Sequence, residues 1–166
     1  MKAIVVADQA AGTAGMKLVD QPEPQAAIND VVVQVHASGF TWDELTWPST
    51  WTDRLGRDRA PVIPGQELAG VITALGYGTS GLSVGQRVFG LTDSYRGGTL
   101  AEYVAVEARN LAPLPGDVGF TAGAGGDAGP NRVARTIPAR SPSGGAEHPR
   151  AWRGRRSRFD GDPART

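Results

Sequence analysis

Side chains that could carry out acid–base or metal chemistry are sparse in this chain. Its 166 residues include two histidines and no cysteine. The lack of cysteine excludes disulfides, thiolate metal sites and cysteine nucleophiles. His36 could act as an acid or a base, but alternation places it mid-strand on the face opposite Val33 and Val35. We expect a surface or structural histidine there, so the residue pattern alone identifies no catalytic group.

Three tryptophans, Trp42, Trp47 and Trp51, fall within ten residues of one another. Only Trp42–Thr46 could begin a helical turn in this stretch, because Pro48 cannot continue one. Large amphipathic rings in a loop have two uses: they can form an aromatic wall for a flat ligand, or they can anchor the loop against the domain. The sequence leaves both open.

Charge is distributed unevenly along the chain. Its 17 basic and 17 acidic side chains cancel overall, but residues 125–166 carry nine arginines and four acidic residues. That segment is also rich in glycine and proline, and it has few large apolar residues and no regular apolar period. Because so few apolar side chains cannot offset the entropy of ordering, we predict a disordered tail over residues 119–166.

The preceding residues alternate in polarity as β-strands do. Residues 1–6 and 31–38 show a period of two, and residues 68–75, 86–91 and 99–106 are further β-rich runs. Glycines separate these runs, at positions where a tight corner needs a positive φ. Many short strands joined by glycine corners favour a mainly β fold, either a small barrel or a sandwich.

Three stretches, taken in order, resemble one known domain. Residues 31–45 (VVVQVHASGFTWDEL) are similar to a strand that ends in an Ala-x-Gly corner and a short acidic turn. Residues 64–90 (PGQELAGVITALGYGTSGLSVGQRVFG) look like a Gly-His-Glu segment, a strand and a hairpin. Residues 98–115 (GTLAEYVAVEARNLAPLP) resemble a Gly-x-x-Ala-Glu-Tyr strand. The set resembles the N-terminal GroES-like domain of the medium-chain dehydrogenase/reductase superfamily, which implies a partly open β-barrel over residues 1–118.

The resemblance fails at the metal-binding positions. In the alcohol dehydrogenase branch, a cysteine after the Ala-x-Gly corner and the histidine of Gly-His-Glu hold a catalytic zinc. Thr41 and Gln66 stand at the matching positions, and neither a hydroxyl nor an amide suits Zn²⁺. Glu67 alone cannot hold a catalytic metal. The resemblance therefore implies no metal and a zinc-independent, NADPH-dependent reductase, in which hydride passes to a quinone or an enone.

The resemblance also implies a set of residues at the substrate and cofactor cleft. They lie in or between the two matching motifs: Phe40, Thr41, Trp42, Trp47, Trp51, Gln66 and Glu67. Thr41 and Gln66 match positions that point at substrate in relatives, and the tryptophans would supply the aromatic wall. Glu67 has a competing structural role, since a carboxylate at the rim of a barrel can accept backbone N–H bonds.

The second domain of this superfamily, a Rossmann fold, supplies the dinucleotide site. The resemblance stops after residues 120–124 (FTAGA), before that domain. If the third base of each codon is chosen suitably, reading the codons of residues 129–165 one base later gives a different amino-acid sequence. That sequence contains SILVHG and a glycine-rich turn, and it resembles the start of a Rossmann fold. We therefore expect the tail to be out of frame. We also expect this chain to bind NADPH weakly or not at all, and to lack reductase activity.

Other functions remain open on the sequence. Residues 150–159 (RAWRGRRSRF) interleave arginine with aromatic rings, so the chain could be a standalone β-barrel with a nucleic-acid-binding arm. It could also bind a protein partner through its cleft face.

We expect a small-molecule quinone or enone as partner and do not expect nucleic acid or a membrane. No apolar run is long enough for a span and no signal segment is evident, so we expect a cytoplasmic protein. Substrate identity and oligomeric state stay open.

Overall fold

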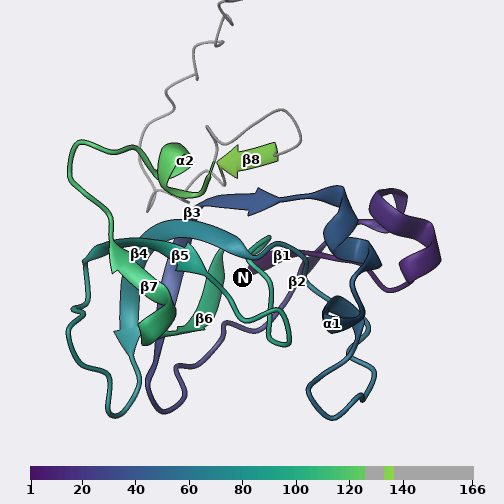
Figure 1. Ribbon diagram of the computed structural model, residues 1–166, viewed down its shortest axis with the longest axis horizontal. Helices are drawn as coiled ribbons and strands as arrows, with labels where there is room; N and C mark the ends of the chain where they lie inside the picture. The colour runs from purple at the N-terminus through teal and green to yellow at the C-terminus, as the bar shows by residue number, and fades with distance from the viewer. Residues whose placement is uncertain (126–132, 137–166) are drawn as a thin grey trace, which may run out of the picture.

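The computed structural model describes residues 1–125 and 133–136 and is built mainly from strands (Figure 1). In chain order the strands are β1 (Lys2–Val5), β2 (Lys17–Asp20), β3 (Asp30–Phe40), β4 (Glu67–Leu75), β5 (Arg87–Leu91), β6 (Tyr103–Glu107), β7 (Leu111–Pro113) and β8 (Val133–Thr136). The short helices are η1 (Gln9–Gly15), η2 (Trp42–Thr46), α1 (Pro48–Trp51), η3 (Ala108–Asn110) and α2 (Phe120–Gly123). Within the described residues, no helix has the length and apolarity to cross a membrane.

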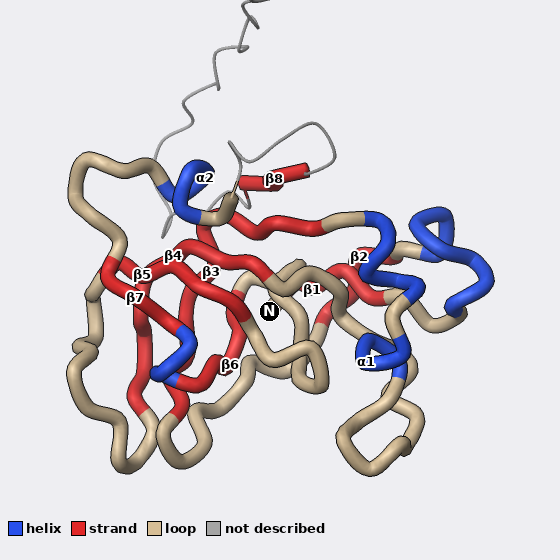
Figure 2. Tube along the Cα trace, in the orientation of Figure 1, coloured by secondary structure: helices blue, strands red, loops and turns tan. Residues whose placement is uncertain are grey.

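The strands form two antiparallel sheets. The larger has the order β6-β3-β4-β5-β7, with β8 pairing the second half of β3, and the smaller consists of β1 and β2. Figure 2 shows the large sheet curling around its core without closing. The predicted mainly β, partly open barrel is therefore confirmed. The long strand β3 organises the molecule, because it pairs with β4, β6 and β8.

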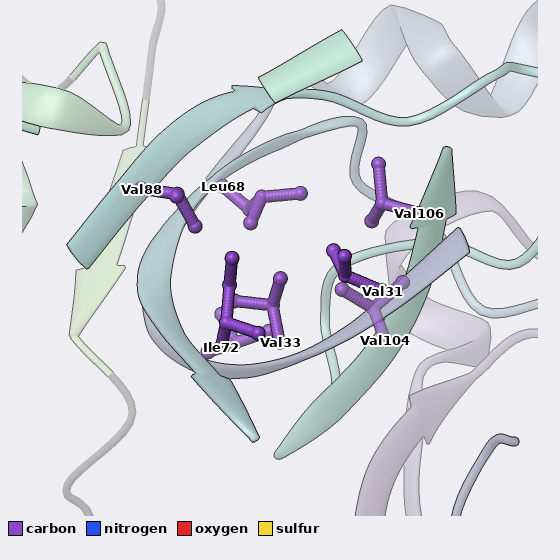
Figure 3. Close-up of a cluster of buried hydrophobic side chains, with 8 residues drawn as sticks. Val31, Val33, Leu68, Ile72, Val88, Val104 and Val106 are labelled. Carbon is purple, nitrogen blue, oxygen red and sulfur yellow. The ribbon is translucent and has the colours of Figure 1, made fainter. Parts of the chain in front are cut away.

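The core lies inside the curl of the large sheet (Figure 3). Alternate residues of β3 point into it, and they meet branched side chains from β4, β5 and β6: Val31, Val33, Val35, Leu68, Ile72, Val88, Val104 and Val106. Each of these is at most 3% exposed. The period of two in residues 31–35 therefore predicted the buried face correctly. Branched side chains of this kind pack well on a pleated surface.

The glycines between the strands form corners, as their spacing predicted. Gly78 and Gly81 have φ of 82° and 77° in the connection between β4 and β5. The sequence of residues 76–81, GYGTSG, also has the spacing of a dinucleotide-binding fingerprint. That fingerprint requires a helix directly after the glycines, whereas here the chain continues into β5. These glycines therefore serve a hairpin and do not form a phosphate site.

A buried ion pair fixes the start of β3. The Asp30 side chain is 2% exposed and accepts bonds from both terminal nitrogens of Arg96, at 2.9 and 2.5 Å. Arg96 lies in the connection that leads to β6, and it also approaches Glu107 at 3.8 Å. Bidentate pairing of this kind fixes geometry as well as charge. It joins the start of β3 to a segment 66 residues away in sequence.

The packed region extends past residue 118, where the sequence placed the start of a disordered tail. Residues 120–123 form α2, and Ala124 is 1% exposed in a cluster with Ala37, Ala69 and Leu114. The small residues of FTAGA fit closely over two alanines of the sheet, so few apolar atoms suffice. The backbone of β8 pairs with β3 from Ala37 to Phe40. The rest of the predicted tail, residues 126–132 and 137–166, lies outside the described residues.

Candidate functional site

The end of β3 and the start of β4 form a rim on the large sheet. Because the two strands are antiparallel, Gly39 lies opposite Glu67, and the residues that follow β3 meet those that precede β4. Thr41 and Gln66, 25 positions apart in sequence, thus belong to adjoining segments. Gly39 allows this approach, since a Cβ at that position would overlap the Glu67 carboxylate.

A buried carboxylate, Glu44, ties the two segments of the rim together. Its Oε1 accepts bonds from the Thr41 N–H at 3.1 Å and the Thr41 hydroxyl at 3.4 Å. Its Oε2 accepts from the Gly65 N–H at 3.1 Å. Sequence reasoning missed Glu44, although the pattern Thr41-x-x-Glu44 is a capping box, a recognisable signal for the start of a helix.

The environment of Glu44 favours its protonated form. The side chain is 5% exposed, and this burial raises the pKa of its carboxyl, with a further increase from the nearby charge of Glu67. The hydrogen bonds from Thr41 and Gly65 act in the opposite direction. Among the described residues, no cation forms an ion pair with Glu44. A carboxyl and a hydroxyl joined in this way can hold or pass a proton.

The tryptophans of the predicted aromatic wall divide into two kinds. Trp51 is 8% exposed, donates its indole N–H to the Leu45 carbonyl at 2.8 Å and packs with Val6 and Val62. It therefore anchors the loop. Trp42 and Trp47 are 65% and 38% exposed, so their rings remain available to a ligand.

The other predicted residues lie at or beside the rim. Phe40 is half-buried and packs against the cluster that contains Trp51. Gln66 is half-buried, and its carbonyl accepts a bond from the Thr92 N–H at 2.8 Å. Together with Glu44, Gln66 lines a small polar cavity of about 10 Å³. The next residue, Glu67, lines a different space, since neighbouring side chains of a strand point to opposite faces.

That space is an open groove of about 620 Å³ beside the sheet. Its lining comes from β4, β5, the segment around β7, and the end of α2: Glu67, Phe89, Gly90, Leu91, Arg109, Asn110, Leu111, Ala112, Gly123, Ala124 and Gly125. Apart from Glu67, none of these was predicted as a site residue. Only the folded sheet brings them together, and no local motif marks them.

The side chains at the rim do not suit a zinc ion. The Thr41 hydroxyl is bonded to Glu44, and no thiolate exists anywhere in the chain. Within residues 1–125 and 133–136 there is no group of three His, Cys, Asp or Glu side chains close enough to hold a metal. The same residues contain no strand, glycine turn and helix in succession that could bind a pyrophosphate.

The comparison with protein families identifies this arrangement. The alcohol dehydrogenase GroES-like domain matches residues 27–116, more than half of the chain. The chain belongs to this family. The match runs from just before β3 through β7, so it includes the rim, the core and most of the groove of this GroES-like domain.

Curated relatives are longer dehydrogenases and reductases. The L-threonine 3-dehydrogenase of Ruegeria pomeroyi is 29% identical over 136 residues, covering 63% of this chain and 37% of the relative. The 2-methylene-furan-3-one reductase of Solanum lycopersicum is 34% identical over 108 residues, covering 58% of this chain and 26% of the relative. The chain thus spans about a third of the length of the relatives that it matches.

Solved structures agree. A mycobacterial quinone oxidoreductase is 28% identical with a TM-score of 0.62, covering 75% of this chain and 36% of that one. The mycobacterial protein Rv1454c in complex with NADPH is also 28% identical, with a TM-score of 0.62 over 75% of this chain and 37% of that one. The predicted resemblance to the N-terminal part of medium-chain dehydrogenases/reductases is confirmed.

Proposed function

We propose that this GroES-like domain is the N-terminal, substrate-facing part of a zinc-independent, NADPH-dependent oxidoreductase that reduces a quinone or an enone. The observation that carries the proposal is the donor set at the rim. Thr41 and Gln66 stand where the zinc-dependent branch has ligands, and the Thr41 hydroxyl is bonded to Glu44. Two relatives support the chemistry: one is named for an enone, 2-methylene-furan-3-one, and the other was solved with NADPH.

In this proposal NADPH, when bound, supplies the hydride, and the rim orients the acceptor and provides a proton. The exposed rings of Trp42 and Trp47 offer flat apolar surface on which a quinone or enone can stack. Reduction of an enone to a ketone consumes one hydride and one proton. The Thr41 hydroxyl is bonded to a carboxyl with a raised pKa, so this pair is suited to deliver that proton.

The first experiment compares this chain with a longer reading frame. Reading the coding DNA across codons 120–129, and restoring one base there, should extend the product to about twice the length. The extended protein should bind NADPH and reduce a quinone or enone in the presence of a chelator. The chain as given should bind NADPH weakly or not at all, because the pyrophosphate contacts dominate dinucleotide binding. An early stop in the restored frame, or an extended product that ignores NADPH, would contradict the proposal.

A matched pair of substitutions in the extended protein tests the rim. Thr41→Val removes the hydroxyl beside Glu44 and should lower kcat for the enone, with little change in KM. Thr46→Val is the control, because the Thr46 hydroxyl is exposed and bonds only the Asp43 carbonyl, at 2.7 Å. Equal kcat values for the two variants would remove Thr41 from the proton path.

The nucleic-acid alternative depends on residues 150–159, which lie outside the described residues, and it stays a prediction. Salt dependence tests it: displaced counterions make real nucleic-acid affinity fall steeply as salt rises. The cytoplasmic location and the absence of a membrane partner likewise remain expectations from the sequence.

A further inference from the structure

Phe120, the first residue of α2, is held between side chains from two strands of the sheet. Its ring stacks on the His36 imidazole with centroids 4.4 Å apart and an interplanar angle of 20°. The Arg87 guanidinium carbon lies 4.6 Å from the centre of the same ring. The short helix is thus attached to β3 through an imidazole and to β5 through a guanidinium.

The strand β3 bulges at His36, whose ring contacts Phe120. Val35 pairs with Gly70 and Ala37 pairs with Ala69, so His36 is an extra residue without a partner on β4. Bulges of this kind redirect side chains and are frequent next to functional sites. The alternation in the sequence placed His36 on the face opposite the core, and the structure shows that its ring contacts Phe120 there.

The position of α2 sets one wall of the 620 Å³ groove. Gly123, Ala124 and Gly125 line the groove together with Glu67 and Phe89. Arg87 also secures the chain that leads into α2, since it donates to the carbonyls of residues 115, 116 and 118. Release of Phe120 would therefore move the groove wall while leaving the incoming segment attached.

We propose that the His36–Phe120–Arg87 stack is a pH-sensitive latch, in which protonation of His36 releases α2 from the sheet and widens the groove. With a neutral imidazole, the stack contains one cation, Arg87. A protonated His36 would be a second cation in a half-buried position near the first, and both desolvation and repulsion oppose it.

Among the described residues, Arg87 is the charged group that acts on the pKa of His36, and it lowers that pKa. From β5, Arg87 is positive; α2 (FTAG) brings no titratable side chain. From β4, Ala69 and Gly70 are uncharged, and Glu67 lies opposite Gly39, three residues further along β3. No carboxylate from the paired strands stands opposite His36 to stabilise an imidazolium.

The sign of the pH effect follows from the geometry. Burial lowers the pKa of His36, and Arg87 lowers it further. A lowered pKa in the docked state means that docking is favoured above about pH 6.5, the ordinary value for histidine, and is lost as the pH falls below it. The equilibrium can change by at most about tenfold per pH unit.

Hydrogen exchange on this chain tests the latch. The N–H groups of Gly123, Ala124 and Gly125 bond within or just after α2, at 2.9–3.1 Å. After correction for intrinsic rates, their exchange should accelerate by up to about tenfold per unit between pH 6.5 and 5.5. The core amide of Val33 should keep its protection, which distinguishes undocking from global unfolding.

Matched variants make the test decisive. His36→Phe keeps a stacking ring without a titratable group, so exchange at residues 123–125 should become independent of pH. His148→Gln changes the only other histidine and should behave as the wild type. A flat wild-type profile would overturn the latch, as would a pH dependence that persists in His36→Phe.

A second measurement does not depend on the folding of His36→Phe. The pKa of His36 can be followed by NMR in the wild type and in Phe120→Ala. Removing the ring should raise the pKa of His36 toward its ordinary value near 6.5. An unchanged pKa would show that Phe120 docking and His36 protonation are not linked, and the proposal would fail.

Discussion

Each end of β3 has a buried carboxylate, and the two are in opposite situations. Asp30, at the start of the strand, is paired with both terminal nitrogens of Arg96, and this pairing lowers the pKa of the Asp30 carboxyl. Glu44, just past the end, accepts bonds from Thr41 and Gly65 without a cation, and burial raises the pKa of the Glu44 carboxyl. Burial alone does not determine the state of an acid; its partner does.

The opposite pKa shifts of Asp30 and Glu44 correspond to the different roles of the two ends of β3. The Asp30 end lies between β4 and β6, where a fixed charge pair joins distant segments. The Glu44 end holds the two rim segments together, and it places a carboxyl with a raised pKa beside the Thr41 hydroxyl. Perturbed acids in such positions are frequent at functional sites. Substitutions in these regions test the difference between the two carboxylates.

The largest effect is expected from Arg96→Ala. It leaves the Asp30 carboxylate buried and unpaired, which should lower the free energy of unfolding by about 3–5 kcal/mol. Urea denaturation at pH 7 measures it. Arg54→Ala is the control, because Arg54 also pairs with an aspartate, Asp93, but is 68% exposed; it should cost less than about 1 kcal/mol. Similar losses of stability in the two variants would show that the buried Asp30–Arg96 pair contributes no more than the exposed Arg54–Asp93 pair.

Glu44→Ala should have an intermediate effect. It removes the acceptors of the Thr41 and Gly65 N–H groups, with an expected loss of about 1–3 kcal/mol. Glu44→Gln keeps one acceptor oxygen and should lose less. The same denaturation assay applies, together with amide exchange at Gly65, which should accelerate in both variants. Unchanged protection at Gly65 would mean that Glu44 does not tie the rim.

Substitution of the buried and the exposed tryptophan should change the free energy of unfolding by smaller amounts. Trp51→Phe removes a buried indole N–H bond and should cost about 1 kcal/mol. Trp42→Phe changes an exposed ring and should stay within about 0.5 kcal/mol. Acrylamide should also quench Trp42 more strongly than Trp51 in single-tryptophan variants. Equal quenching would contradict the division into anchor and available surface.

The pH dependence of stability should show opposite signs for the two carboxylates. The pKa of Asp30 is lowered, so its contribution is present above its unfolded value near 4 and is lost as pH falls through the folded pKa. The pKa of Glu44 is raised, so its contribution is present at low pH and is lost as pH rises through the folded value. Relative to wild type, Asp30→Asn should thus improve with acidification and Glu44→Gln with rising pH. If the stabilities of the two variants relative to wild type changed with pH in the same direction, the opposite pKa shifts of Asp30 and Glu44 would be contradicted.

Much of the fold could be predicted from local pattern. Alternation in residues 31–35 identified the core face of β3, and the glycine corners identified the hairpins. The positions of Thr41 and Gln66 came from family motifs, and the antiparallel pairing of β3 with β4 explains why those motifs adjoin. The three tryptophans, by contrast, gave no sign of which would be buried, because burial depends on contacts with distant residues such as Val6 and Val62.

The amino-acid types themselves determined the available chemistry. Without cysteine, and with a hydroxyl and an amide at the matching positions, this chain lacks a thiolate and an imidazole at those two positions, whatever its fold. Tertiary structure decided which acids have raised or lowered pKa values and which residues form the groove. Those properties depend on burial and on partners many positions away, such as Arg96 for Asp30, Gly65 for Glu44 and Phe120 for His36. A local sequence period carries no information about such distant pairings, so only the folded chain could specify them.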